Sequence, residues 1–299
     1  MRLSRAERKE ALVAYALISP WLVGFVFVTA GPMIASIILS FFKYDIIHPA
    51  QFVGMQNYMH MAKSDPLFWQ SLKVTTIYVL FGVPLTLGVS LAMALLLNNA
   101  VRGITIFRTI FYLPAVMSGV AVALLWQWVF NPNYGILNYL LEMVGIIGPN
   151  WLGDENWVVP AFIIMSLWGA GSGMVILLAG LQGIPTQLYE AARIDGATWW
   201  QEFFKITLPM LSPTLFFNLI MNIISSWQVF TPAYVMTQGG PNYGSLFYVF
   251  YLYRNAFVEF KMGYACALAW VMFFIILLCT LAVFKSSPLW VYYEAERRQ

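Results

Sequence analysis

The chain contains a long run, Ala11–Phe42, in which no side chain is charged. This run is too long for the hydrophobic core of a signal peptide, and no convincing cleavage site follows a short apolar segment. As a helix it would exceed the roughly 30 Å of a bilayer's hydrocarbon core. The whole chain is 61% hydrophobic and only 10% charged, whereas about 25% charged residues is usual for soluble domains. We therefore predict an all-α polytopic membrane protein.

The 299 residues have room for about six membrane-spanning helices of roughly 20 residues each, in a single transmembrane domain. The apolar segments between polar loops predict spans at about 12–39, 74–97, 109–130, 157–181, 212–236 and 263–284. The fourth and fifth spans are separated by a polar loop, 182–209.

The distribution of Lys and Arg predicts the orientation, because cytoplasmic loops carry the excess of these residues. One side has eleven basic residues, namely Arg2, Arg5, Arg8, Lys9, Arg102, Arg108, Arg193, Lys205, Lys285, Arg297 and Arg298. The other side has five, namely Lys43, Lys63, Lys73, Arg254 and Lys261. This asymmetry predicts that both termini and the 182–209 loop are cytoplasmic.

The Glu190–Pro209 stretch is the most polar long interruption in the second half of the chain. We expect a short helix to start at Pro185–Thr186 and to end at Gly196, because glycine accepts the left-handed conformation that follows a helix. Thr198 and Gln201 have the spacing of a capping box for a second helix, and we expect Pro209 to end it. The alternative is an ordinary loop helix without a partner.

Catalytic and energy-coupling motifs are absent from the sequence. It contains no GxxxxGK[ST] loop for ATP, and His48 and His60 are the only histidines, so no metal-ligand cluster is expected. The two cysteines, Cys266 and Cys279, lie about 20 Å apart along one helix and cannot pair. The predicted spans lack the ionisable residues typical of ion-coupled transporters. We therefore expect a transport protein that is driven by a partner, and the net charge of +3 is not a nucleic-acid signal.

A neutral polar stripe follows one face of the predicted fifth span. Its members are Asn218, Asn222, Ser225, Ser226 and Val229, which recur at helical spacing. Amides and hydroxyls donate and accept hydrogen bonds, so this face suits a neutral polyhydroxylated solute. The alternative is that these residues hold helices together. For the Gly169–Gly173 run in the fourth span, we favour close helix packing over a role beside a ligand.

The Glu190–Pro209 stretch resembles the EAA signature of bacterial ABC importer permeases. The matching positions, together with Asp195 between them, are Glu190, Ala191, Ala192, Asp195, Gly196, Ile206, Leu208 and Pro209. The resemblance implies the type I ABC importer permease fold, with this loop coupled to a separate ATPase. It also implies that the chain binds no cofactor itself, since Mg-ATP would be held by partner subunits.

Further segments resemble carbohydrate-type permeases, such as those for maltose and glycerol phosphate. These segments are Thr237–Pro241, Tyr251–Phe257 and Gly263–Ala265. The resemblance implies a sugar or oligosaccharide substrate that contacts Asn222, Ser225, Ser226 and Val229. It also implies a bacterial or archaeal cytoplasmic membrane location and three kinds of partner: a second, different permease subunit, two cytoplasmic ATPase subunits and an extracytoplasmic solute-binding protein. The alternatives are a permease of the same fold for glycerol phosphate, an amino acid, phosphate or a peptide, and a secondary transporter or membrane-embedded enzyme.

Overall fold

The computed structural model describes residues 5–99 and 102–292, so the basic residues Arg2, Arg297 and Arg298 lie outside it. The chain divides into two compact units. Unit 1 comprises the residues up to Ser64 together with Leu252–Val271, and unit 2 comprises Asp65–Tyr251 together with the chain from Met272. Helices make up nearly all of the regular secondary structure in the described residues, which confirms the predicted all-α class.

Unit 1 begins with a continuous apolar helical stretch, Lys9–Leu39. Its elements are α1 (Arg5–Gly24), the π-helix η1 (Phe25–Ala30), α2 (Gly31–Leu39), the antiparallel strands β1 (Phe42–Lys43) and β2 (Gln51–Phe52), α3 (Gln56–Lys63), the π-helix η4 (Arg254–Val258) and the first part of α14 (Met262–Trp290). Two hydrogen bonds tie α14 to the N-terminal segment: Gly263 N donates to Tyr44 O at 3.1 Å, and Trp270 Nε1 donates to Ser36 Oγ at 3.1 Å.

Unit 2 is built around α4 (Pro66–Leu97). The side chain of Asp65 caps this helix by accepting from Leu67 N and Phe68 N, at 3.0 and 3.1 Å, which satisfies two of its free N-terminal donors. Three helices pack against α4, namely α8 (Val158–Trp168), α9 (Gly171–Gln182) and α12 (Leu208–Trp227). The central position of α4 therefore lets residues from distant parts of the chain meet along it.

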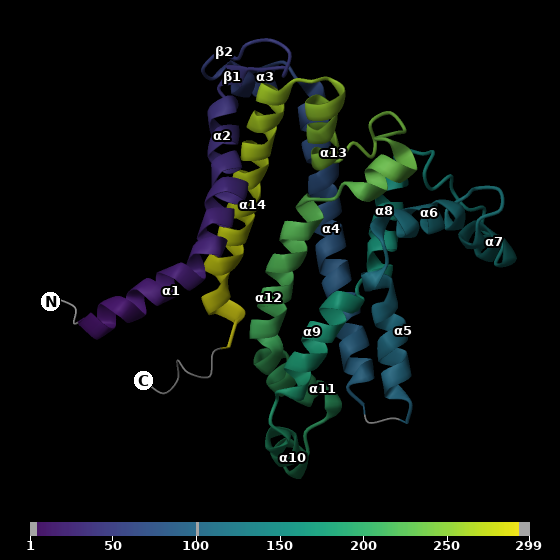
Figure 1. Ribbon diagram of the computed structural model, residues 1–299. Helices are drawn as coiled ribbons and strands as arrows, with labels where there is room; N and C mark the ends of the chain where they lie inside the picture. Colours follow the sequence, from purple (N-terminus) through teal and green to yellow (C-terminus); the bar gives the residue numbers. More distant parts are fainter. Residues whose placement is uncertain (1–4, 100–101, 293–299) are drawn as a thin grey trace. The chain divides into compact units, whose positions relative to one another are not determined.

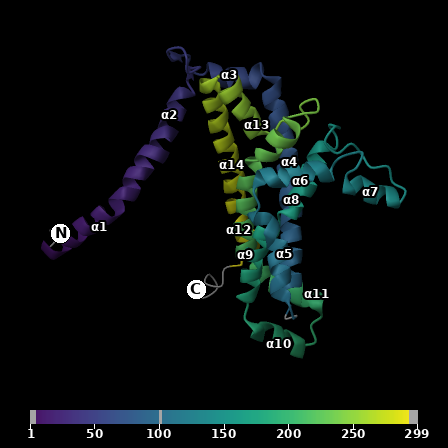
Figure 2. The same cartoon turned by 45° about the vertical axis from the view of Figure 1, so that its right-hand side comes forward.

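Shorter elements complete unit 2. They are α5 (Ile104–Val116), α6 (Gly119–Val129), α7 (Ile136–Met143), α10 (Thr186–Ile194), α11 (Trp199–Glu202), the π-helices η2 (Phe203–Thr207) and η3 (Ala233–Thr237), and α13 (Tyr248–Tyr253), which crosses the border between the units. The views in Figures 1 and 2 both place α10 and α11 beyond the ends of α9 and α12.

The helices differ from the six predicted spans mainly by bends. Four uninterrupted helices are long and apolar enough to cross a membrane, and up to six spans result if each of two bent pairs counts as one. In the region of the expected third span, α5 and α6 meet at 99°, and in that of the fourth, α8 and α9 meet at 45°. The first break falls at Met117–Ser118 and the second at Gly169–Ala170.

The prediction that Pro209 ends a helix was wrong. Residues Trp199–Trp227 form one continuous helix through α11, η2 and α12, so the fifth span does not begin anew at 212. The physical reason is the π-helical turn of η2, in which Leu208 N donates to Phe203 O rather than to an α-helical partner. This wider turn accommodates a proline, which lacks a donor and crowds the preceding turn of an α-helix. Ser212 Oγ instead donates to Pro209 O at 2.6 Å.

Candidate coupling and transport sites

Gly196 ends α10 with the predicted left-handed turn. Its φ is +75°, its N–H donates to Arg193 O at 3.1 Å, and the N–H of Ala197 donates to Ala192 O at 2.9 Å. These two bonds form the Schellman pattern that satisfies the last carbonyls of a helix. Thr198 then caps α11, with its N–H donating to Gln201 Oε1 at 2.7 Å. The short helix before Gly196, the glycine turn and the Thr198–Gln201 cap are therefore confirmed, whereas the second helix continues past Pro209 to Trp227.

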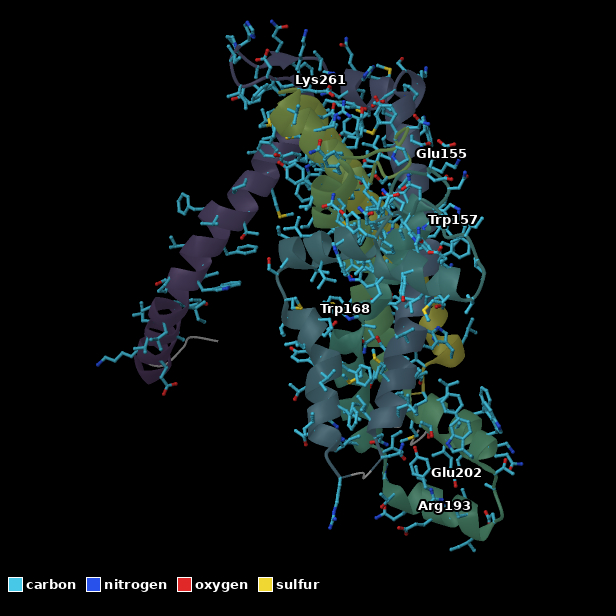
Figure 3. All side chains as sticks on the ribbon, turned by 90° about the vertical axis from the view of Figure 1, so that its right-hand side faces the viewer. Glu155, Trp157, Trp168, Arg193, Glu202 and Lys261 are labelled. Atoms are coloured by element: carbon cyan, nitrogen blue, oxygen red, sulfur yellow. The ribbon has the colours of Figure 1, made fainter. Side chains whose placement is uncertain are left out.

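An ion pair fastens α10 to α11 across this turn. Arg193 Nε donates to Glu202 Oε1 at 3.0 Å, as the labelled side chains in Figure 3 show. Glu202 is buried and Arg193 is largely exposed. The hydrogen bond to Glu202, followed by its negative charge, raises the pKa of the Arg193 guanidinium above its already high ordinary value. Arg193 therefore keeps its positive charge throughout the physiological pH range.

A second contact joins the same two segments. The hydroxyl oxygens of Tyr189 and Thr207 lie 3.0 Å apart, and Tyr189 also packs against the apolar cluster formed by α4, α9 and α12. With the ion pair, this gives two attachments between α10 and the helix that begins at Trp199. These attachments favour movement of α10 and α11 as one body.

The outward face of α10 is apolar. Leu188, Ala191 and Ile194 are exposed at spacing i, i+3, i+6, so they lie on one side of the helix. Ile194 is 87% exposed.

The other motif residues differ in exposure. Glu190, Asp195 and Gly196 are also exposed, whereas Ala192, Ile206, Leu208 and Pro209 are half-buried. Ile206 and Leu208 pack against the apolar cluster of unit 2. The motif thus combines residues that fix the loop with residues that face outward.

A polar cavity of about 270 Å³ lies beside α12 in unit 2. Four of the five residues of the predicted stripe line it, namely Asn222, Ser225, Ser226 and Val229. The fifth, Asn218, does not line the cavity: it is buried, and its amide donates to Thr214 O at 3.2 Å. Val229 follows the end of α12 at Trp227, so the turn after the helix, rather than a further helical turn, brings it to the cavity.

Among the other walls of the cavity, the sequence singles out only the Gly169–Gly173 run, for which close helix packing is favoured over a role beside a ligand. Helix α4 contributes Tyr78, Thr86 and Ser90, and the α8–α9 region contributes Ser166, Gly169, Ala170, Ser172 and Gly173. None of the lining residues is Asp, Glu, Lys, Arg or His. A repeat of hydroxyl and small residues at helical spacing, such as Thr86 with Ser90, was the available signal. The cavity therefore presents neutral donors and acceptors from three helices.

The glycine run in the α8–α9 region allows the close helix packing that the sequence favours. A Cβ on Gly171 would lie 2.2 Å from Phe111 O, and one on Gly173 would lie 2.7 Å from Ser90 Oγ, so neighbouring helices approach closely here. At the same time, the helix is interrupted at Gly169–Ala170 beside the cavity. The hydroxyl of Ser90 donates to Ala170 O at 2.8 Å, which satisfies a carbonyl next to the break.

Asn222 offers an acceptor to this cavity. Its amide nitrogen donates to Asn218 O at 2.9 Å. Its amide oxygen accepts no hydrogen bond from the residues that the structure describes, and Ser225 Oγ donates to Asn222 O at 3.1 Å. The helix backbone thus holds the side-chain amide of Asn222 in place, and the oxygen of this amide is available to a ligand.

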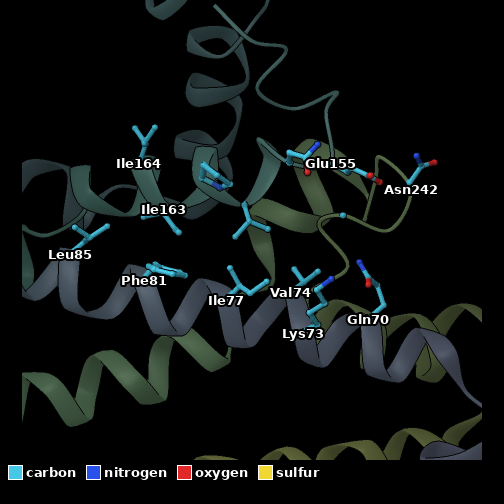
Figure 4. Close-up of a pocket in the computed structure, with 14 residues that line it drawn as sticks. Gln70, Lys73, Val74, Ile77, Phe81, Leu85, Glu155, Ile163, Ile164 and Asn242 are labelled. Atoms are coloured by element: carbon cyan, nitrogen blue, oxygen red, sulfur yellow. The ribbon is translucent and has the colours of Figure 1, made fainter.

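A larger groove of about 750 Å³ lies between α4 and α8 (Figure 4). Its apolar walls include Ile77, Phe81 and Ile163, and its polar end includes Lys73 and Glu155. Because both this groove and the polar cavity are lined by α4 and α8, the two occupy neighbouring faces of the same helix pair.

Comparison with known proteins identifies the family. Residues 85–287 match the model of the "Binding-protein-dependent transport system inner membrane component" family. A relative, the probable ABC transporter permease protein YesP of Bacillus subtilis, is 48% identical over 99% of this chain and 97% of its own length. The trehalose/maltose transport system permease protein MalF of Thermococcus litoralis is 32% identical over 94% of this chain and 96% of its own length.

The fold also matches a solved transporter. A crystal structure of a bacterial ABC transporter involved in the import of the acidic polysaccharide alginate contains a chain with a TM-score of 0.78. That chain is 24% identical, and the match covers 94% of this chain and 96% of that one. At this identity the match shows the fold, which is that of an ABC importer permease. Together with the family match and the full-length relatives, it follows that this chain belongs to the binding-protein-dependent ABC transporter permeases, the multi-pass inner-membrane components of these transport systems.

Proposed function

We propose that this permease carries a sugar or oligosaccharide across the cytoplasmic membrane through the polar cavity beside α12. The observation that carries the proposal is the cavity itself, because Asn222, Ser225, Thr86 and Ser166 surround it with neutral hydrogen-bonding groups. Such groups match the hydroxyls of a carbohydrate. The trehalose/maltose permease that is 32% identical along almost the whole chain supports the same solute class.

The proposed solute contacts are Asn222, Ser225, Ser226 and Val229. The buried Asn218 lies against α9 rather than in the cavity, since its side-chain oxygen would be 3.3 Å from a Cβ on Gly173. Of the five residues in the predicted stripe, the proposed contacts thus keep the four that line the cavity and leave out Asn218.

The energy for transport comes from ATP that other subunits bind and hydrolyse. In this proposal, the chain has no ATPase site or cofactor of its own, and two cytoplasmic ATPase subunits hold Mg-ATP. The outward face of α10, with Leu188, Ala191 and Ile194, docks into a groove of one ATPase subunit. The motif residues Glu190–Pro209 then transmit its movement to α12, which runs on from α11 without a break.

The remaining partners are a second, different permease subunit and an extracytoplasmic solute-binding protein. The excess of Lys and Arg on one side of the predicted spans, eleven against five, supports a cytoplasmic position for the 182–209 loop and for both termini. Solute would enter from the opposite side. Coupling requires that the solute bind the outward-open and inward-open states with different affinities.

Transport by the reconstituted system tests the proposal. The solute is first identified by a thermal-shift screen of sugars, glycerol phosphate, amino acids and peptides against the partner binding protein. The full transporter is then placed in proteoliposomes, and uptake of the radiolabelled solute is measured with ATP and with a non-hydrolysable analogue. We expect ATP-dependent uptake of a carbohydrate. Uptake of an amino acid or peptide without competition by sugars would overturn the solute class.

The coupling role is tested separately in the same vesicles. Replacing Ile194 by Asp puts a charge on the outward face of α10 and should reduce co-purification of the ATPase subunits. The matched control is Ile147→Asp, because Ile147 is similarly exposed but lies in the 144–157 segment away from the loop. Equal co-purification with both variants would contradict docking through α10.

A further inference from the structure

The helix that begins at Trp199 is longer than a membrane requires. It runs for 29 residues to Trp227, which corresponds to about 43 Å at about 1.5 Å per residue, against a hydrocarbon core of about 30 Å. Lys205 is its last charged residue. The part after Lys205 has about 22 residues and already suffices to cross the core. The first turns, from Trp199 to Lys205, therefore extend beyond the hydrocarbon.

Four aromatic rings cover one side of these first turns. Trp199 stacks on Phe203 at a centroid distance of 5.6 Å and an interplanar angle of 9°, and Trp200 stacks on Phe204 at 6.0 Å and 17°. The two pairs also touch each other edge to face, at 4.6 Å between the tryptophans and 4.9 Å between the phenylalanines. We call this set Trp199, Trp200, Phe203 and Phe204 the aromatic face.

The aromatic face is open rather than packed. Trp199 is 58% exposed, Trp200 62% and Phe204 57%. Neither indole N–H donates a hydrogen bond to a residue that the structure describes. Exposed tryptophans of this kind combine a large apolar ring with a donor that needs a polar partner.

The polar residues of the same turns lie on the other side of the helix. Gln201, Glu202 and Lys205 follow the aromatic positions at spacings that turn them away from the rings. Glu202 accepts a hydrogen bond from Arg193 of α10, so α10 is attached to the polar side of the Trp199–Trp227 helix. The aromatic side therefore remains available to a different environment from the one that α10 meets.

We propose that the aromatic face lies in the headgroup layer of the membrane and anchors the start of the Trp199–Trp227 helix at the lipid–water boundary. Tryptophan rings are enriched at this depth because they place an apolar body in the lipid and a donor at the headgroups. The face is continuous with the apolar part of a membrane-crossing helix, which fixes lipid as its occupant. Lys205, at the same level, suits anionic headgroups. This proposal does not depend on the coupling role of α10.

Depth measurements with a spin label test it. Starting from Cys266→Ala with Cys279→Ala, a single nitroxide is placed at Trp200→Cys or Phe204→Cys, with Gln187→Cys on α10 as the control position. The assembled transporter is placed in nanodiscs of phosphatidylcholine and phosphatidylglycerol. We expect collisions with oxygen to exceed those with a water-soluble nickel chelate severalfold at positions 200 and 204, and the reverse at position 187. The ratio should not change when the ATPase subunits are removed.

Other outcomes overturn the proposal in distinguishable ways. Low collision rates with both reagents that rise when the ATPase subunits are removed would assign the face to that protein. Low rates with and without those subunits would assign it to the second permease. A ratio at position 200 equal to that at position 187 would place the face in water. Only labelled variants that first assemble with all subunits are measured, and Phe204→Cys, at a position whose ring stacks on Trp200, carries the test if Trp200→Cys fails to assemble.

Discussion

The coupling element and the polar cavity are built in opposite ways. The coupling element, Thr186–Pro209, is contiguous in sequence and closes on itself through the Gly196 turn and the Arg193–Glu202 pair. The cavity is assembled from α4, the α8–α9 break and the end of α12, whose residues are up to about 150 positions apart. Local hydrogen bonds and one ion pair therefore determine the structure of the coupling element, whereas close helix packing determines the shape of the polar cavity. Substitutions in the two regions should accordingly fail in different ways.

The largest effect is expected where the cavity depends on packing. Gly171→Ala places a Cβ 2.2 Å from Phe111 O, so the backbone of α5 or α9 must move. Overpacking of this kind costs about 3 kcal/mol, and we expect a clear fall in the thermal unfolding temperature of the purified permease in detergent. Gly88→Ala is the matched control, because nothing lies within 4 Å of the added methyl group. Equal unfolding temperatures for the two variants would show that packing does not determine this region.

The next effect concerns the ion pair. Arg193→Ala leaves the buried Glu202 without its partner, which should weaken the link between α10 and α11 less than the loss of a fully buried pair would, because Arg193 itself is mostly exposed. Solute-stimulated ATPase activity of the assembled transporter should fall more than membrane insertion does. Combining Arg193→Glu with Glu202→Arg should restore part of it, whereas Arg102→Ala should leave it unchanged. A double variant that is as inactive as the single one would argue against the pair.

A smaller effect is expected at the turn. Gly196→Ala meets no neighbouring atom within 4 Å, so its cost is only that of φ at +75° for a residue with a Cβ, about 1–2 kcal/mol. Coupled ATP hydrolysis should fall while subunit assembly persists. Gly196→Asn should lose less, because asparagine tolerates the left-handed region. If alanine and asparagine behave alike, backbone conformation is not what limits the turn.

The smallest effect is expected at the cavity wall. Asn222→Ala removes one acceptor from the cavity and one bond to Asn218 O, worth about 1 kcal/mol, so the half-saturating solute concentration should rise about fivefold. The unfolding temperature and ATPase-subunit assembly should stay near those of the unsubstituted protein. Asn99→Ala, at the exposed end of α4, is the control. Unchanged solute affinity in the Asn222 variant would remove this residue from the proposed contacts.

The sequence predicted the contiguous region almost completely. The glycine turn and the Thr198–Gln201 cap are short-range features with strong residue preferences, and both were found as expected. The ion pair was not foreseen, because its partners lie nine positions apart across a turn whose angle the sequence does not specify. The error at Pro209 arose because a π-helical turn, which gives the proline room, has no clear sequence signal.

The dispersed region was predicted only in part. The stripe on α12 follows helical spacing, and four of its five members reach the cavity. Helical spacing could not show that Asn218 turns towards α9 or that Ser90 satisfies Ala170, since these depend on which helices become neighbours. The apolar pattern places three long helices near 12–39, 74–97 and 263–284, but it sets the fifth span at 212–236 whereas the helix runs from Trp199 to Trp227. It also did not reveal the 99° bend between α5 and α6.

The π-helical turn η2 has a consequence for the rest of its helix. It inserts one residue relative to an α-helical ladder, and one residue corresponds to about 100° of rotation around the axis. The turn therefore acts as a phase shift between the loop that contains Glu202 and the wall that contains Asn222. Deleting Lys205 would keep every motif residue yet rotate Asn222 away from the cavity. Chimeras between related permeases should accordingly preserve the number of residues from Gly196 to Asn222 before they preserve the residues themselves.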